Sequence, residues 1–222
     1  MVAAVAAVVV VVAVVFAVSD TTSATQPPGA SASSLRQRLV AAGSAGPLGP
    51  EGIPVPDAPI LVGTYRAAVG QPVDDIACAT GEQLAFHVHT HLTIFVHGAA
   101  RQVPAGVGIT PPRQAQQTPR GVFVDGGGCF YWLHTHAADG IIHIESPLAH
   151  RAFTLGDFFD IWGVRLGPQQ VGPATGPVTA FYNGKVYRGD PRSIPLGNHT
   201  QIQLDVGTPL VAPESVTFPS GL

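Results

Sequence analysis

Residues 131–146 read YWLHTHAADGIIHIES and carry the clearest fold signal in the chain. Short alternations of apolar and polar residues flank Asp139-Gly140, a dipeptide typical of the type I′ turn that joins two antiparallel strands. With these two residues as the loop, Ala138 pairs with Ile141. The segment therefore predicts a hairpin in which alternate side chains of each strand project from one face.

The predicted register gathers histidines on one face of this hairpin. His136 falls opposite His143, and His134 falls opposite Glu145, with the Cβ atoms of each pair about 4.5–5.5 Å apart. The other face carries apolar residues, namely Leu133, Ile142 and Ile144. We therefore expect three imidazoles and one carboxylate to form a compact patch, which a one-residue slip of the register would destroy.

A second histidine motif, HVHTHLTIFVHG, occupies residues 87–98. His87, His89 and His91 take alternate positions in a predicted strand, so their side chains share one face. The other face carries apolar residues, namely Val88, Leu92, Ile94 and Val96. The simplest arrangement places this strand and the hairpin in one sheet, with their histidine faces together.

This clustering predicts a transition-metal site, because imidazole is a suitable ligand for zinc, copper, iron and nickel. The predicted ligands are His134, His136 and His143, with His87, His89 and His91 completing or flanking the site. The only methionine is Met1, and Cu(I) sites generally use soft Met or Cys ligands, so Zn²⁺ and Cu²⁺ are the expected ions. The candidate groups outnumber the ligands of one ion, so some orient the ligands or bind a second ion.

Three functions follow from such a site. The first is an exported protein that binds Zn²⁺ or Cu²⁺. The second is a zinc-dependent hydrolase or hydratase, because three histidines with an open fourth position can lower the pKa of a bound water to about 7. Glu145 would then act as the base or orient a ligand. The third is a structural or cell-surface domain whose histidines form a hydrogen-bond network.

The two cysteines, Cys78 and Cys129, predict a disulfide, because an even count in an exported protein favours one. Thiolate ligation of the metal is the alternative. In a regular strand Cys129 has the opposite parity to His134 and His136, so it points away from the histidine face. This parity favours the disulfide.

The N-terminal part of the chain predicts export. Residues 2–18 are entirely apolar and end in small residues, so residues 1–19 form a signal peptide or an uncleaved membrane anchor. Residues 20–57 are rich in Ser, Ala, Thr, Pro and Gly and predict a flexible linker. Residues 58–222 then form a single β-rich domain, which is secreted, periplasmic, at the cell surface or anchored through residues 2–18.

The remaining pattern predicts a mainly β fold, as a sheet, sandwich or barrel, with one short amphipathic helix. Thr154 and Asp157 form a capping-box variant, and Gly163 is placed to end the helix. Its apolar stripe consists of Leu155, Phe158, Phe159 and Trp162. Asn183-Gly184 predicts a second hairpin turn. Residues 110–120 predict a loop, residues 201–206 a strand and residues 214–218 an edge strand.

Charge narrows the range of partners. The net charge is −3 at pH 7 and the pI is about 6.3. No basic stretch is interleaved with aromatic residues, which argues against a nucleic-acid partner. The expected partner is a metal ion, with membrane contact only through the N-terminal segment. The sequence does not indicate which protein partners to expect.

Two resemblances accompany these motifs. His134 and His136, with His143 on the neighbouring strand, resemble the three-histidine zinc site of alpha-class carbonic anhydrases, although those enzymes are larger and their other sequence features are missing here. The blocks at residues 87–98, 131–147 and 153–163 resemble those of an uncharacterised family of exported or membrane-anchored prokaryotic proteins. This second resemblance covers about residues 78–206. It implies an exported protein and no particular reaction.

Overall fold

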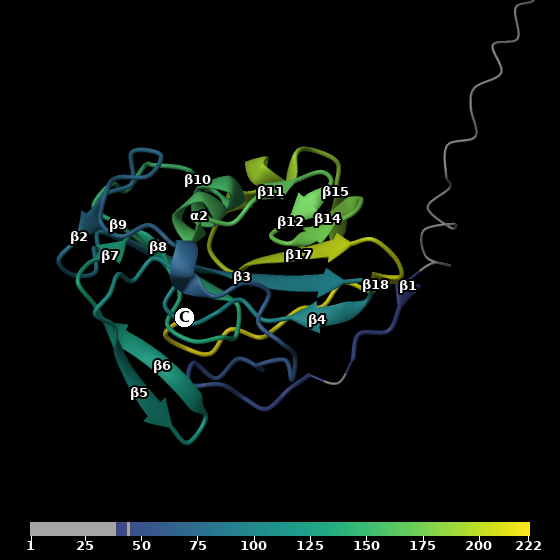
Figure 1. Cartoon of the computed structure of the whole chain (residues 1–222), viewed down its shortest axis with the longest axis horizontal. Coiled ribbons are helices and arrows are strands. Elements are labelled where there is room, and N and C mark those ends of the chain that lie inside the picture. The colour runs from purple at the N-terminus through teal and green to yellow at the C-terminus, as the bar shows by residue number, and fades with distance from the viewer. Residues whose placement is uncertain (1–38, 44) are drawn as a thin grey trace, which may run out of the picture.

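The structure is a computed structural model that describes residues 39–43 and 45–222 (Figure 1). The described residues form a mainly β protein with one α-helix, as the sequence predicts. The predicted signal segment and the first part of the predicted linker, residues 1–38, lie outside the described residues. Among the residues described, no helix is both long and apolar enough to cross a bilayer.

Strand β3 (Phe86–Val96) is the centre of the largest sheet. It pairs with β17 (Thr200–Val206) in parallel and with β9 (Ile141–Ser146) in antiparallel orientation. The sheet is completed by β15 (Lys185–Tyr187) and β14 (Val178–Tyr182) beyond β17, by β8 (Leu133–His134) beyond β9, and by β4 (Ala99–Arg101) beside the end of β3. The two histidine motifs therefore lie on adjacent strands, as predicted.

One face of this sheet packs on the helix α2 (Leu155–Trp162) and forms the hydrophobic core. Thr154 and Asp157 make the predicted capping box, and Gly163 ends the helix with a left-handed φ of 69°. The apolar sides of the histidine strands all lie in or against this core, namely Val88, Leu92, Ile94, Val96, Leu133, Ile142 and Ile144. Their burial fixes which face the histidines take.

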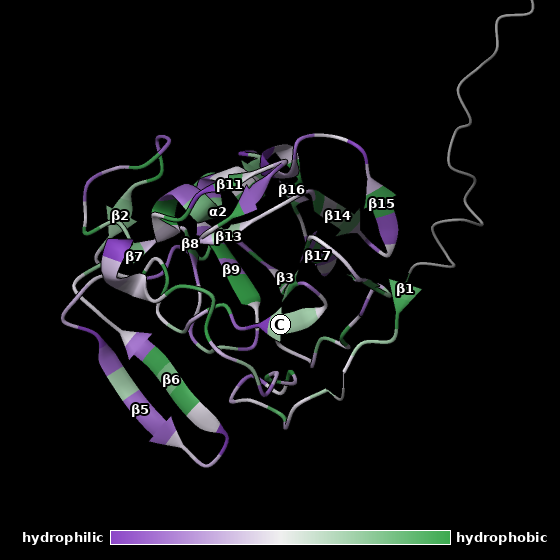
Figure 2. Cartoon of the chain, turned by 45° about the vertical axis from the view of Figure 1, so that its right-hand side comes forward, coloured by the Kyte–Doolittle hydropathy of each residue, from purple (hydrophilic) through white to green (hydrophobic). Residues whose placement is uncertain are grey.

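Smaller sheets surround the main one. They are β1 (Leu39–Val40) with β18 (Leu210–Val211), β2 (Cys78–Ala79) with β7 (Phe130–Tyr131), β5 (Gln114–Thr118) with β6 (Gly121–Gly126), β10 (Phe153–Thr154) with β16 (Pro195–Leu196), and β11 (Leu166–Gly167) with β12 (Gln170–Val171) and β13 (Ala174–Thr175). Short 3₁₀ turns occur at Thr64–Arg66 and Pro191–Ser193. The β5–β6 hairpin projects from the body, with β5 largely hydrophilic (Figures 1 and 2).

Some predicted elements differ from the structure. The expected loop at residues 110–120 contains β5, whose polar residues pair with β6 across a two-residue turn. Residues 214–218, predicted as an edge strand, form no strand in the structure. The side chains of Gln201 and Gln203 bind the backbone of this segment, at Val216 and Glu214, where a ladder of backbone hydrogen bonds was expected.

The ordered domain begins earlier than the predicted boundary at residue 58. Leu39–Val40 pairs with Leu210–Val211, and Ile53 is fully buried. Backbone hydrogen bonds close a compact turn between Gly49 and Ile53. The described part of residues 39–57 therefore packs against the domain rather than acting as a flexible linker, because Ile53 supplies an apolar anchor among small residues.

Asp205 on β17 gives the fold a testable dependence on pH. Burial raises the pKa of Asp205 to about 6 from 3.8, although hydrogen bonds from Val211 and Gln203 oppose the rise. Between these two pH values the folded state holds a proton on Asp205 that the unfolded state has lost. The stability contributed by this proton is fully present below pH 3.8 and is lost as the pH rises through about 6. Relative to the wild type, Asp205→Asn should become more stable as the pH rises through this window. Urea unfolding of both proteins at several pH values measures the difference, and a constant difference would contradict the assignment.

Candidate metal centre

The hairpin that carries the candidate ligands has a different register from the predicted one. His134 pairs with His143, and Leu133 pairs with Ile144, so the predicted pairing of His136 with His143 was wrong by two residues. Because the shift is two residues, His134 and His143 still project from the same face. The histidine face therefore survives the correction, but His136 lies in a loop.

The longer loop has a physical cause in Thr135. Its backbone N–H donates to the Val107 carbonyl, its carbonyl accepts from the Gly106 N–H, and its hydroxyl donates to the Pro104 carbonyl. These bonds tie Thr135 to residues 104–107, so it cannot continue the ladder with β9. The tight turn predicted at Asp139-Gly140 is instead the end of a loop, closed by a bond from Ile141 N–H to the Asp139 carboxylate.

Pairing of β3 with β9 brings the two histidine motifs together. His89 lies opposite His143, and His87 lies opposite Glu145. Two overlapping groups of possible ligands result, each with its ligand atoms within 4.8 Å of one another: His134, His136, His143 and Glu145, and His87, His89 and His143. These histidine and glutamate side chains, all buried except His87, have the composition and spacing to hold a metal ion.

His134 and His136 have ring orientations fixed by the backbone. The Nδ1 of His134 bonds to the Tyr131 carbonyl, and the Nδ1 of His136 bonds to the Val124 carbonyl. A carbonyl only accepts, so each Nδ1 carries the proton, and each neutral ring presents a lone pair at Nε2. These two Nε2 atoms face each other at 3.2 Å.

Burial keeps these two rings neutral. It lowers the pKa of His134 well below the ordinary histidine value, with like charge on His143 and His136 as further causes. Burial also lowers the pKa of His136. Two neutral rings whose lone pairs point at each other cannot form a hydrogen bond, whereas a cation between them would satisfy both.

His143 is the residue that both groups share. Its Nδ1 lies 3.1 Å from His89 Nε2 and 3.4 Å from Glu145 Oε1, and its Nε2 lies 2.6 Å from Glu51 Oε1. Burial opposes a charge on this ring, but hydrogen bonds to Glu145 and Glu51 raise its pKa to about 9. Glu51 was missed at the sequence level because it falls in the predicted linker, 92 residues away.

Glu145 lies between the two groups. Its Oε1 is 3.2 Å from His87 Nε2, and its Oε2 is 3.9 Å from His134 Nε2. The side chain is buried, and Oε2 has no hydrogen-bond partner among the described residues. A buried carboxylate oxygen without a partner is costly, and a bound cation would remove that cost.

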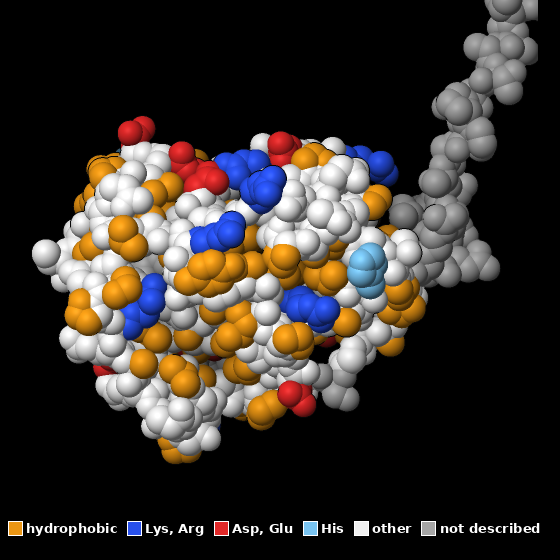
Figure 3. Space-filling model, in the orientation of Figure 1, with side chains coloured by type: hydrophobic (Ala, Val, Ile, Leu, Met, Phe, Trp, Pro, Cys, Tyr) orange, Lys and Arg blue, Asp and Glu red, His pale blue; other side chains and the backbone are white. Residues whose placement is uncertain are grey.

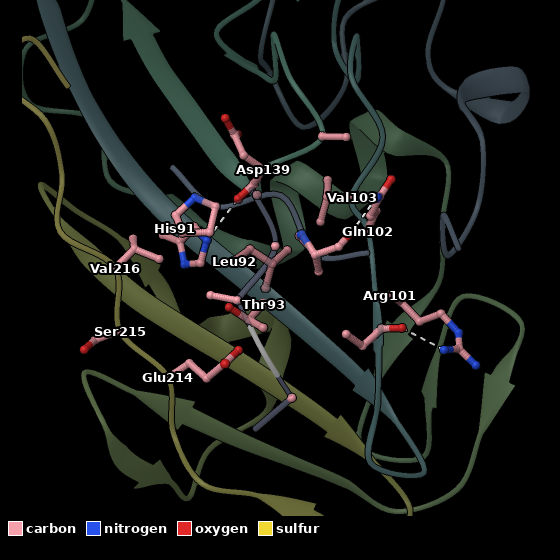
Figure 4. Close-up of a pocket in the computed structure, with 18 of the residues that line it drawn as sticks. His91, Leu92, Thr93, Arg101, Gln102, Val103, Asp139, Glu214, Ser215 and Val216 are labelled. Carbon is pink, nitrogen blue, oxygen red and sulfur yellow. Dashed lines mark hydrogen bonds between the residues drawn. The ribbon is translucent and has the colours of Figure 1, made fainter. Parts of the chain in front are cut away.

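His91 is the predicted ligand that the structure places elsewhere. Its ring lines a separate cavity, drawn in Figure 4. The volume of this cavity is about 380 Å³, and His91 Nε2 bonds to the Asp139 carbonyl at 3.0 Å. Burial lowers the pKa of His91 to about 4. The strand alternation predicted a shared face for His87, His89 and His91, but His91 lies opposite Ile141, where β9 begins, and contacts Asp139 in the loop that precedes β9.

The cluster opens to a cavity of about 210 Å³, lined by both histidine motifs and by Phe123 of the projecting hairpin. The Phe123 ring stacks on His136 with centroids 4.9 Å apart. His87 is the most exposed of the cluster histidines, with 37% of its side chain accessible. The other four rings of the cluster are buried. Little histidine surface is visible on the face of the molecule drawn in Figure 3.

The cysteines form the predicted disulfide, Cys78–Cys129, and are therefore not metal ligands. The bond supports the pairing of β2 with β7, which directly precedes β8 along the chain. A disulfide is compatible with an extracellular location.

Gly108 supports the backbone behind His134 and gives a test of this packing. Both Gly108 and Gly184 have positive φ, at 69° and 75°. A Cβ on Gly108 would collide with the Leu133 carbonyl, whereas no described atom lies within 4 Å of a Cβ on Gly184. Gly184→Ala should therefore cost about 1–2 kcal/mol from backbone strain alone. Gly108→Ala should cost at least about 1 kcal/mol more. Equal losses in denaturant unfolding would argue against the close contact.

The comparisons with known proteins return nothing: no protein-family model, curated protein or solved structure matches the chain. The fold and the geometry of the site therefore define the class of the protein. It is a mainly β protein with a largely buried cluster of histidine and glutamate side chains that can hold a metal ion.

Proposed function

We propose that the protein is an exported metal-binding protein that holds Zn²⁺ or Cu²⁺ in its histidine cluster. The observation that carries the proposal is the pair of Nε2 atoms of His134 and His136, which face each other at 3.2 Å while both Nδ1 atoms bond to carbonyls. His143 and Glu145 complete this group. The ligand types match the borderline-soft ions that imidazole prefers.

The spacing of the ligand atoms supports an ion of this size. Zinc binds imidazole nitrogen at about 2.0–2.1 Å, so two nitrogens of a tetrahedral site lie about 3.3–3.4 Å apart. The contacts between ring nitrogens in the cluster are 3.1 to 3.2 Å. The hydrogen bonds from Nδ1 to backbone carbonyls are the usual partners that orient ligating histidines.

A purely structural hydrogen-bond network fits this site less well. His89 Nε2 contacts both His87 Nε2 and His143 Nδ1, at 3.1 Å each. One ring nitrogen carries either a proton or a lone pair, so it can make one good hydrogen bond and not two. One of the two contacts of His89 Nε2 therefore lacks a hydrogen bond. The contact between His134 Nε2 and His136 Nε2, whose lone pairs face each other, also lacks a proton to share.

The adjoining cavity supports a zinc-dependent hydrolase or hydratase as the second candidate. About 210 Å³ of space borders His89, His143 and Glu145, enough for water and a small substrate. Zinc there would supply an acidified water, and Glu145 would hold or accept a proton beside it. An open coordination position would favour this enzyme, and closure by four protein ligands would favour binding alone.

Export rests on the apolar segment at residues 2–18, on the disulfide, and on the resemblance to exported or membrane-anchored prokaryotic proteins. The segment lies outside the described residues. Cys78 and Cys129 pair as they would in an oxidising compartment. A copper or zinc site in that compartment exchanges metal with the cell's surroundings rather than with the cytosol.

Metal content tests the proposal. Protein purified from its native compartment without chelators should contain stoichiometric metal by elemental analysis. His134→Ala and His143→Ala should lower affinity by more than the roughly 10–100-fold that follows loss of a residue that only orients a ligand. Glu51→Gln should fall within that smaller range, because Glu51 contacts His143 from outside the ligand group.

His150→Ala serves as the matched control, because His150 is exposed and belongs to neither ligand group. It should retain the wild-type metal content. If both His134→Ala and His143→Ala kept the wild-type metal content, the proposed site would be wrong. If the wild-type protein contained no metal, the proposed function would be wrong.

A further inference from the structure

We propose that the cluster is a dinuclear centre, in which the Glu145 carboxylate bridges two divalent ions. This inference rests on the proposed function and adds a second ion to it. It starts from the position of Glu145, whose two oxygens face opposite groups of histidines. Oε1 lies beside His87 and His143, on what we call the β3 side of the cluster. Oε2 lies beside His134, on what we call the β8 side.

The β3 side offers three histidine ring nitrogens with a carboxylate oxygen beside two of them. His87, His89 and His143 each have a ligand atom within 4.8 Å of the others, and His89 Nε2 lies 3.1 Å from both His87 Nε2 and His143 Nδ1. Glu145 Oε1 lies 3.2 Å from His87 Nε2 and 3.4 Å from His143 Nδ1. These four separations are close to the ~3.3 Å expected for neighbouring ligands of one zinc-sized ion.

The other side offers its own ligand atoms. His134 Nε2 and His136 Nε2 are 3.2 Å apart, and Glu145 Oε2 is 3.9 Å from His134 Nε2. Glu82 Oε1 lies 3.5 Å from His136 Nε2 and is a further oxygen within reach. None of these atoms belongs to the β3 side. The two groups of ligands therefore share Glu145 through different carboxylate oxygens.

One ion cannot use all of these groups. Five imidazoles and both oxygens of Glu145 converge on the site, whereas zinc takes four protein or water ligands in most sites. His143 belongs to both groups, but its Nε2 is bonded to Glu51, so Nδ1 is the ligand atom that it has left. We assign this atom to the β3 side, because it lies 3.1 Å from His89 Nε2. A carboxylate that binds one ion through each oxygen places the ions about 3.5–4 Å apart, as in two-metal sites.

The charge of the surroundings fits two divalent cations. Glu145 lies at the centre, Glu51 contacts His143, and Glu82 and Asp125 line the cavity beside the rings. Lys and Arg side chains are not among the residues that line this cavity in the described part of the chain. The negative charges of these four carboxylates would balance two ions of charge +2.

Copper loading of the full chain tests the second ion. We expect two Cu²⁺ per protein by elemental analysis after removal of excess copper. We also expect a magnetically coupled pair in the electron paramagnetic resonance spectrum, with loss of the signal of isolated Cu²⁺. His150→Ala, at an exposed position outside both ligand groups, should leave both readouts unchanged.

Variants then separate the two positions. His89→Ala should leave one Cu²⁺ at the His134–His136 side, and His134→Ala should leave one at the His87–His89 side, each with an uncoupled spectrum. Glu145→Gln keeps a single carbonyl oxygen and should abolish coupling. Circular dichroism checks that each variant folds.

The wild-type measurement alone decides between the outcomes. One tightly bound Cu²⁺ with an uncoupled spectrum overturns the dinuclear centre and leaves the proposed metal-binding function standing. Two ions without magnetic coupling overturn the carboxylate bridge. Absence of bound copper overturns both the dinuclear centre and the proposed function.

Discussion

The pairing of β3 with β9 is the interaction on which the site depends. It sets His89 opposite His143 and His87 opposite Glu145, so residues 54 and 58 positions apart in the sequence become neighbours. The same register places Val88 against Ile144 on the opposite face, where both contact the core. The apolar contacts on one face therefore hold the polar groups together on the other.

The sequence predicts the faces of these strands but not the loop between them. Alternation alone identifies the side of His134 and Glu145, because a shift of two residues preserves parity. The observed loop between the strands depends on Thr135, whose hydrogen bonds reach residues 104–107. No local sequence pattern predicts that contact. His91 shares the alternation of His87 and His89, yet its partner Ile141 is the first residue of β9, and its ring bonds to Asp139 in the preceding loop.

Glu51 shows a different limit of sequence reading. It lies in a stretch rich in small residues and Pro, whose composition predicts a linker, and its contact with His143 spans 92 residues. The anchor of that stretch is Ile53, which is fully buried and holds the turn against the domain. A single apolar residue among small ones is too weak a pattern to predict such packing, although it decides where Glu51 lies.

Burial of so many titratable groups carries a desolvation cost. Burial lowers the pKa of His89 to about 3, and the neighbouring His143 and His87 add to this effect. Rings held this close gain little from one another, since their nitrogens compete for too few protons. Their positions are nevertheless defined by carbonyls of Tyr131 and Val124 and by the carboxylate of Glu51. A cluster that is oriented from outside and unsatisfied inside is what a preformed cation site requires, because the ion then supplies the missing interactions without having to reorganise the protein.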